Sequence, residues 1–134
     1  MGATAVKQVP EMPIVTIKLF VANPQDFGPA FDLQAVADEL GVLFGSGPGQ
    51  TWLRLECQPR PHYAENGTLP EATSCPTFVE VLKARLPAPE VLAVEADQIA
   101  TIVSRLVGCP KENTHVLYLP EAVGRIAFNG RLLT

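Results

Sequence analysis

The chain has 134 residues, which suits one compact domain with a hydrophobic core of its own. Its net charge is −4 and it has no basic stripe interleaved with aromatic residues, which excludes the usual nucleic-acid-binding classes. No apolar run approaches the roughly 20 residues that span a bilayer, and residues 1–8 lack the apolar stretch of a secretory signal, so we expect neither membrane insertion nor export.

The cysteines and histidines predict reduced thiols and no metal site. Cys57, Cys75 and Cys109 form no C-x-x-C pair, and an odd number of cysteines without a secretion signal is typical of cytoplasmic thiols. His62 and His115 lie far apart in the chain and have no ligand-spaced neighbours, so we expect no bound metal or other cofactor. The composition therefore predicts a cytoplasmic protein.

The first half of the chain predicts a strand, a helix and a second strand. Residues 14–20 alternate between apolar and polar, which is the period of a strand with one buried face. Residues 21–31 are rich in glycine and proline and are predicted as a loop. Asp32 can cap a helix, and apolar residues follow it at the spacing of one helical face up to a stop at Gly45. Residues 51–57 alternate again and form the second predicted strand.

The second half predicts the same elements in the same order. Residues 77–83 form a strand, a longer helix opens at Pro89 and stops at Gly108, and residues 114–119 form the fourth strand. An ungapped shift of 63 residues aligns the halves, with identities that include Pro13/Pro76, Leu19/Leu82, Ala37/Ala100, Leu43/Leu106, Gly45/Gly108, Asn66/Asn129 and Gly67/Gly130. We therefore predict a duplicated unit, with a leader at 1–12, repeats at 13–67 and 76–134, and a linker at 68–75.

These elements predict an α/β fold of the two-layer α+β kind, with residues 13–134 in a single domain. A strand, a helix and a strand make a crossover unit with parallel strands. Two such units side by side would give a four-stranded mixed sheet with both helices on one face. The other face would be bare, and 47% of the residues are hydrophobic, so we expect a homo-oligomer in which the bare face packs against copies of itself.

Short segments in a fixed order carry a family resemblance. Residues 12–17 read Met-Pro-Ile-Val-Thr-Ile, residues 52–56 Trp-Leu-Arg-Leu-Glu and residues 62–67 His-Tyr-Ala-Glu-Asn-Gly, and residues 114–118 and 124–131 add to the pattern. Together with the duplication, this order resembles the tautomerase superfamily, the group that includes 4-oxalocrotonate tautomerase and macrophage migration inhibitory factor (MIF). The resemblance extends from the proline of the first segment to the end of the chain. It implies two short tautomerase units fused in one chain, a trimer with sheets facing a central axis, and no metal or organic cofactor.

The resemblance also implies where a substrate would bind. Members of the superfamily use an amino-terminal proline as a general base, because a desolvated secondary amine can be neutral near pH 7, and Pro13 stands at this position. Arg54 would hold the substrate carboxylate through a planar two-donor fork. Tyr63, with His62 beside it, would form part of the pocket wall. The implied reaction is keto–enol tautomerisation or isomerisation of a small 2-oxo or 2-hydroxy unsaturated acid.

Pro13 departs from the superfamily pattern, because residues 1–12 precede it and an internal proline nitrogen is an amide without basicity. Three interpretations stay open. In the first, the mature chain starts at Met12 or is cut there, so that Pro13 becomes terminal. In the second, the leader is present and the protein is a variant without a catalytic proline. In the third, the oligomer is a non-catalytic domain that binds a small acid or a protein partner.

Overall fold

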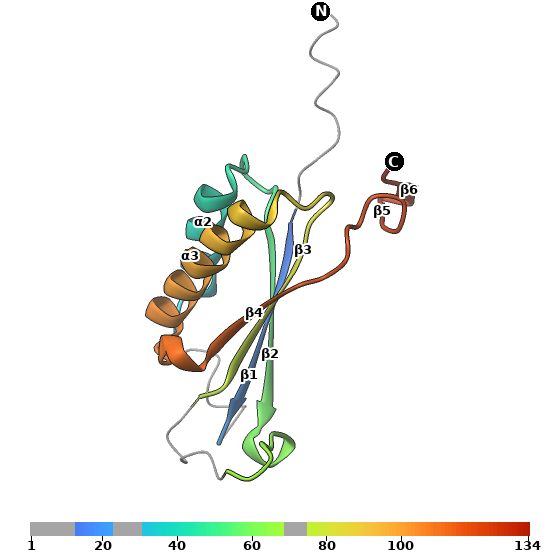
Figure 1. The fold of residues 1–134 in the computed structure, drawn as a ribbon. Helices are drawn as coiled ribbons and strands as arrows, with labels where there is room; N and C mark the ends of the chain where they lie inside the picture. Colours follow the sequence, from blue (N-terminus) through green and yellow to red (C-terminus); the bar gives the residue numbers. More distant parts are fainter. Residues whose placement is uncertain (1–12, 23–30, 69–74) are drawn as a thin grey trace, which may run out of the picture.

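The predicted strands and helices are present in a computed structural model, which describes residues 13–22, 31–68 and 75–134 (Figure 1). The leader at 1–12, and most of the predicted loop and linker, lie outside the described residues. The main elements are β1 (Ile14–Val21), α2 (Leu33–Phe44), β2 (Trp52–Pro59), β3 (Thr77–Leu82), α3 (Pro89–Val107) and β4 (Thr114–Tyr118). Short 3-10 turns, η3 (Arg60–His62) and η4 (Lys111–Asn113), follow β2 and α3, and the chain ends in the small strands β5 (Ala127–Phe128) and β6 (Arg131–Leu132).

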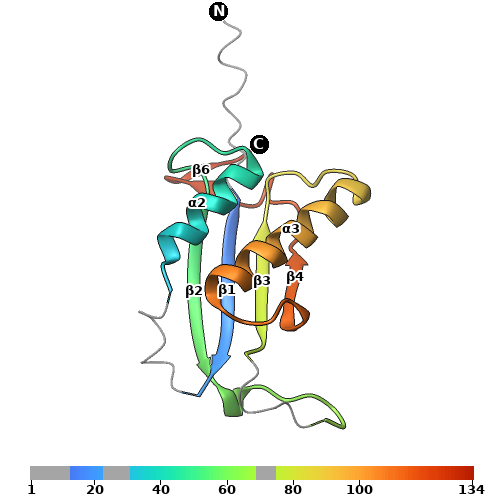
Figure 2. The same cartoon turned by 90° about the vertical axis from the view of Figure 1, so that its left-hand side faces the viewer.

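The four main strands form one mixed sheet in the order β2-β1-β3-β4. β1 and β2 are parallel, β3 and β4 are parallel, and the two pairs meet through the antiparallel contact between β1 and β3. Each parallel pair is joined through a helix, as a crossover connection requires. Both helices cover the same face of the sheet (Figures 1 and 2). The predicted two-layer α/β fold is therefore confirmed.

Local sequence signals fix the ends of both helices. The Asp32 carboxylate accepts hydrogen bonds from the backbone N–H groups of Gln34 (3.0 Å) and Ala35 (3.3 Å), which would otherwise lack partners at the start of α2. The helix ends at Gly45, whose φ of 68° is the left-handed conformation that glycine adopts without strain. Gly108 ends α3 in the same way, at a φ of 88°.

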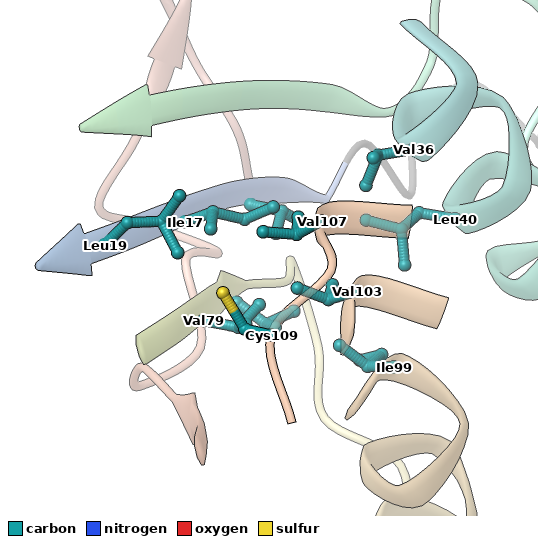
Figure 3. Packing of buried hydrophobic residues seen from close by; sticks show 11 residues of the cluster. Ile17, Leu19, Val36, Leu40, Val79, Ile99, Val103, Val107 and Cys109 are labelled. Carbon is teal, nitrogen blue, oxygen red and sulfur yellow. The ribbon is translucent and has the colours of Figure 1, made fainter. Parts of the chain in front are cut away.

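The core lies between the helices and alternate residues of the central strands. Val15, Ile17 and Leu19 of β1 are fully buried, as are the two valines of β3 on the same face. One side of each helix closes over them (Figure 3), with α2 contributing Val36 and Leu40 and α3 contributing Ile99, Val103 and Val107. Complete burial of a branched aliphatic side chain stabilises the fold by about 1.5–3 kcal/mol, so this layer is the main source of stability.

The chain ends in a hairpin that the sequence predicted only as a turn. Asn129 and Gly130 have φ angles of 53° and 79°, the two positive values that a type I′ turn between β5 and β6 requires. The hairpin lies on the side of the sheet away from the helices, near the start of β1 (Figures 1 and 2). There the Phe128 ring packs edge-on against the Trp52 ring, with the centroids 5.4 Å apart.

The two halves share one architecture, but the ungapped alignment fails in the strands. A shift of 63 residues matches the helix faces, because it superposes Val36 on Ile99, and both are buried. In the strands the same shift places buried Val15 on Phe78, which points to the opposite face. A shift of 62 restores agreement between β1 and β3, and a shift of 61 between β2 and β4. Since strand side chains alternate, a slip of one residue exchanges the two faces, which the identity count could not detect.

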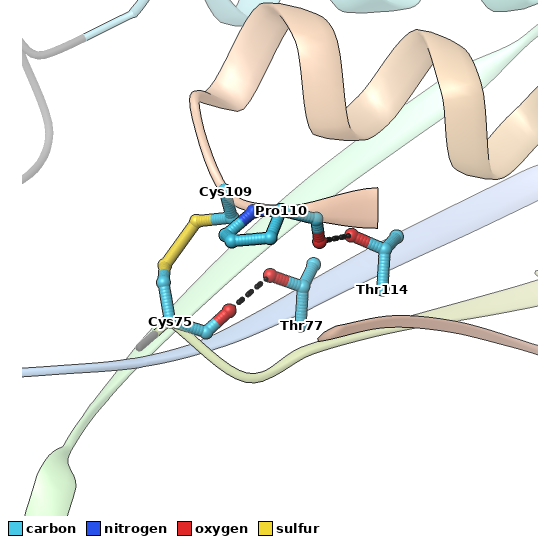
Figure 4. Close-up of a disulfide and its surroundings, with 5 residues drawn as sticks. All are labelled: Cys75, Thr77, Cys109, Pro110 and Thr114. Atoms are coloured by element: carbon cyan, nitrogen blue, oxygen red, sulfur yellow. Dashed lines mark hydrogen bonds between the residues drawn. A yellow bond between two sulfur atoms is a disulfide. The ribbon is translucent and has the colours of Figure 1, made fainter. Parts of the chain in front are cut away.

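The expectation of three reduced thiols is wrong for two of them. Cys75 and Cys109 form a disulfide with a Cα–Cα distance of 5.6 Å, although 34 residues separate them in sequence (Figure 4). The fold brings the start of β3 beside the end of α3, a proximity that spacing alone does not reveal. Cys57 is the free cysteine, and burial raises the pKa of its thiol.

The membrane and metal expectations were examined on the described ranges alone. Within them, no helix has the length and apolar content needed to cross a bilayer. Likewise, residues 13–22, 31–68 and 75–134 contain no group of three His, Cys, Asp or Glu side chains arranged to hold a metal ion.

Candidate functional site

Pro13 lies at the start of β1 and is buried. Its side chain is less than 2% exposed, and its carbonyl oxygen accepts a hydrogen bond from the backbone N–H of Trp52 (3.0 Å). Proline has no N–H to lose to the sheet, so it is tolerated as the residue that precedes a strand. We call this edge of the sheet, where β1 and β2 begin and β3 ends, the Pro13 end.

Arg54 lies at the Pro13 end, on the sheet face that the helices leave uncovered. We call this the open face; it carries Thr16 and Lys18 of β1, Arg54 of β2 and Glu80 of β3. The Arg54 guanidinium donates from Nη2 (2.9 Å) and Nε (3.2 Å) to Thr16 Oγ1. Thr16 is the only partner of Arg54 among the described residues, and a guanidinium has five N–H donors in a planar fork. The exposed group therefore keeps donors that suit a carboxylate.

Tyr63 and His62 lie at the opposite edge, which we call the Tyr63 end. The Tyr63 ring packs on Phe20 at 5.3 Å and on Phe78 at 6.1 Å between centroids. Its hydroxyl donates to the Glu65 carboxylate, and this hydrogen bond, with burial, raises the pKa of Tyr63. His62 Nδ1 lies 3.4 Å from Gln58 Oε1.

The residues predicted for one pocket are thus divided within a single chain. Phe20 follows Pro13 by seven residues, so at about 3.3 Å per residue the two ends are about 23 Å apart. The structure brings Pro13 and Arg54 together and places Tyr63 and His62 out of their reach. One chain alone cannot complete the predicted pocket.

A polar triad at the Pro13 end was not recognised in the sequence. Lys83, which follows β3, donates from Nζ to both carboxylate oxygens of Glu95 on α3 (2.9 and 3.3 Å). The Tyr118 hydroxyl at the end of β4 donates to Glu95 Oε1 (2.8 Å), and the Lys83 ammonium lies 5.2 Å from the centroid of the Phe44 ring. The Lys83 and Glu95 side chains are only 11% and 12% exposed.

The triad is neutral overall and its hydrogen bonds are satisfied. Burial, followed by the hydrogen bond to Glu95, raises the pKa of the Tyr118 hydroxyl, which therefore remains a proton donor across the physiological range. The sequence held one signal for this triad: Lys83 continues the buried alternation of β3, a position where an apolar residue is expected. Tyr118 had been noticed there only as an acid or water-positioning candidate.

Two hollows lie away from these residues. One, of about 740 Å³, lies between α2 and the loop that leads to β2, and its described lining includes Asp38, Val42 and Trp52. Another, of about 410 Å³, lies between α2 and α3 and is lined by Leu43 and Ile102. Neither contains a described pair of side chains suited to acid–base chemistry, so we place the candidate site at the Pro13 end.

Comparison with known proteins gives a result only at the level of structure. No protein-family model matches the chain, and no curated protein sequence matches it either. Among solved structures, a MIF homologue from Prochlorococcus marinus has a TM-score of 0.66 and 17% sequence identity, over 90% of this chain and 99% of that one.

Two further solved structures have similar scores. A fused 4-oxalocrotonate tautomerase, solved as a symmetric trimer, has a TM-score of 0.69 and 13% identity, over 89% of this chain and 94% of that one. The protein Pt0534, solved after inactivation by 2-oxo-3-pentynoate, has a TM-score of 0.70 and 15% identity over the same shares, 89% and 94%. The chain therefore has the fold of the tautomerase superfamily, as the sequence predicted.

Proposed function

We propose that this protein binds a small 2-oxo or 2-hydroxy unsaturated acid at the Pro13 end and interconverts its tautomers once the Pro13 amine is free. The observation that carries the proposal is the proximity of Pro13 and Arg54 at one end of a tautomerase fold. Among similar structures, a fused 4-oxalocrotonate tautomerase and a protein inactivated by a 2-oxo acid point to the same class of substrate.

The proposed reaction needs only one proton to move. Arg54 would bind the substrate carboxylate with N–H donors beyond those it directs at Thr16, which fixes the acid beside Pro13. A free, neutral Pro13 amine would take a proton from the carbon next to the carbonyl group, as electrons move onto the carbonyl oxygen. Return of the proton to oxygen or to another carbon completes the isomerisation and regenerates the amine.

We infer a homo-trimer for this chain. The fused relative is a trimer, and the open face here lacks a covering layer among the described residues apart from the terminal hairpin. Four rings crowd this face at the Tyr63 end, with Phe78 and His115 5.3 Å apart between centroids. In an oligomer, the Tyr63 end of one chain can approach the Pro13 end of another, which a single chain does not allow.

A non-catalytic function is the second candidate, and a specific observation favours it. In the full chain the Pro13 nitrogen is an internal amide and the ring is buried, so the chain as written has no terminal base. The Arg54 guanidinium would still bind a small carboxylate in that state.

The test compares the full chain with a version that starts at Met12, from which methionine removal exposes Pro13. Intact mass and amino-terminal sequencing establish the first residue, and phenylpyruvate and 2-hydroxymuconate ketonisation measure activity. We expect activity in the shortened protein only. A trimeric shortened protein with Pro13 exposed and no activity on either acid would contradict the catalytic proposal and leave the binding function.

Arg54→Ala tests the carboxylate anchor in the same shortened protein. Charged hydrogen bonds contribute about 1.5–3 kcal/mol, so we expect kcat/KM to fall about 100-fold. Arg105→Ala is the matched control, because Arg105 is an exposed arginine paired with Glu39 on the helix layer. Equal kcat/KM values for the two variants would remove Arg54 from the site.

The cytoplasmic location stays a prediction. The Cys75–Cys109 disulfide argues against it, since disulfides persist mainly in oxidising compartments. Thiol alkylation in the native cell before lysis, followed by mass spectrometry, distinguishes the two states.

A further inference from the structure

The Lys83–Glu95–Tyr118 triad lies beside Pro13 on the helix side of the sheet. The antiparallel register pairs Ile14 with Leu82 and Val15 with Val81. One more step in the same register places Pro13 opposite Lys83, and side chains directly opposite in an antiparallel pair begin about 5 Å apart. Val15 and Val81 both face the core, so Pro13 and Lys83, two residues away on each strand, face it as well.

The fold does not require these polar groups. At the shifts that preserve the strand faces, Lys83 corresponds to Val21 and Tyr118 to Cys57, and both of these pack against the hydrophobic core. The first half therefore closes the same position without a buried charge. A buried lysine carries a large desolvation cost unless it is paired, and an apolar replacement of a buried ion pair is often at least as stable. Stability alone is a weak reason for the triad at this end.

Few other charged groups face the Pro13 end. Arg54 approaches from β2 on the open face, separated from the triad by the sheet itself. The Glu121 carboxylate accepts from the Leu86 backbone N–H (2.7 Å), and Arg85 is exposed. The nearby end of α2 contributes the Phe44 ring and no described charge. On the helix side, Lys83 and Glu95 are thus the charges closest to Pro13.

We propose that the Lys83–Glu95–Tyr118 triad sets the basicity of the free Pro13 amine. This inference rests on the proposed function, because it concerns the amine that acts as the base. With both charges present the triad is neutral, and each charge offsets the effect of the other on the amine. Removing the ammonium leaves a buried carboxylate that favours protonated Pro13, and removing the carboxylate leaves an ammonium that disfavours it.

The two single variants therefore have opposite effects. A unit charge about 10 Å away, at an effective dielectric constant of about 20, moves a pKa by about one unit. In the shortened protein, Lys83→Met is expected to raise the pKa of the Pro13 amine by about one unit. Glu95→Gln, which keeps an acceptor for Tyr118, is expected to lower it by a similar amount.

The double variant and Tyr118→Phe complete the design. Lys83→Met with Glu95→Gln removes both charges and is expected to return the pKa to the starting value. Tyr118→Phe removes one hydrogen bond and no charge, so it is the matched control for disturbed packing and is expected to leave the pKa unchanged. Circular dichroism establishes that each variant is folded at the temperature used, and the double variant serves if a single variant unfolds.

The pKa is measured without relying on activity. Reductive methylation with formaldehyde and cyanoborohydride is followed against pH, and mass spectrometry of the amino-terminal peptide reports the extent at Pro13. The pH dependence of kcat/KM is measured in parallel. Opposite shifts in the single variants support the inference; equal pKa values in all folded variants, or shifts of the same sign, overturn it.

The two proposals can fail separately. If the shortened protein is inactive while the methylation pKa shifts as expected, the proposed function fails and the triad still controls the amine. If the protein is active and the methylation pKa does not respond to either charge, the triad has only a structural role.

Discussion

The two ends of the sheet have different chemistry, although each is built by the same kind of strand–helix–strand unit. The Pro13 end gathers Arg54 on the open face and the buried Lys83–Glu95 pair on the helix side. The Tyr63 end gathers aromatic rings on the open face, and the disulfide of Cys75 ties β3 to the helix layer there. The difference indicates that one end is equipped for proton transfer and the other for packing and stability.

The disulfide should have the largest effect on stability. It joins residues 34 apart, and the loss of such a cross-link increases the freedom of the unfolded chain. We expect Cys75→Ser with Cys109→Ser to lower the free energy of unfolding by about 4 kcal/mol in urea denaturation without reductant. Cys57→Ser is the control for a change of thiol alone, and an unchanged midpoint in the double variant would remove the disulfide from the comparison.

At the Pro13 end, the largest stability effect should come from breaking the buried ion pair. Glu95→Ala leaves the Lys83 ammonium buried without its partner, which costs about 3 kcal/mol of unfolding free energy. Glu39→Ala breaks a pair of the same chemistry with Arg105 at exposed positions, where we expect a loss below about 1 kcal/mol. Similar losses in the two variants would show that burial of the triad has no energetic consequence.

Tyr118 predicts a dependence of stability on alkaline pH. The pKa of its hydroxyl is raised in the folded protein, so its contribution is complete below the unfolded value of about 10 and is lost as pH rises through the folded value. Tyr118→Phe should cost about 1 kcal/mol at neutral pH, from one hydrogen bond, and should flatten the decline above about pH 10. Urea midpoints at pH 7 to 11 measure both; a decline as steep in the variant as in the parent protein contradicts the assignment.

Tyr63 should have the smallest effect of the four. Its hydroxyl bonds only Glu65 among the described residues, at an exposed position. Tyr63→Phe keeps the ring contacts with Phe20, so we expect the unfolding free energy to change by less than about 0.5 kcal/mol. The same urea series measures it, and a loss as large as that of Tyr118→Phe would mean that the two ends do not differ in the way described.

The sequence predicted what local patterns determine. The cap at Asp32, the stops at Gly45 and Gly108 and the helical faces depend on neighbours within a few residues, and all are present. The alternation of β1 and β2 gave the strands, and the duplicated order gave the sheet topology. The tautomerase resemblance gave the fold, which the structural comparisons confirmed.

The remaining features depend on contacts between distant segments. The Cys75–Cys109 pair forms because β3 starts beside the end of α3, and no spacing rule predicts it. Lys83 and Glu95 meet through the packing of α3 on the sheet, and a charged residue at a buried position in an alternating strand was the only local sign. The position of Tyr63 far from Pro13 follows from the direction of β1, which a list of candidate pocket residues does not contain.

The most direct test of the account is covalent labelling of the Pro13 end by 2-oxo-3-pentynoate, the acid that inactivates a protein of the same fold. A free amine adds to the alkyne carbon of this reagent, forming a nitrogen–carbon bond and retaining the whole reagent mass. In the shortened protein with Pro13 exposed, we predict one adduct on the peptide that begins at Pro13, and none on that proline in the full chain. A folded shortened protein that gains no label at Pro13, or gains it at another residue, would contradict the account.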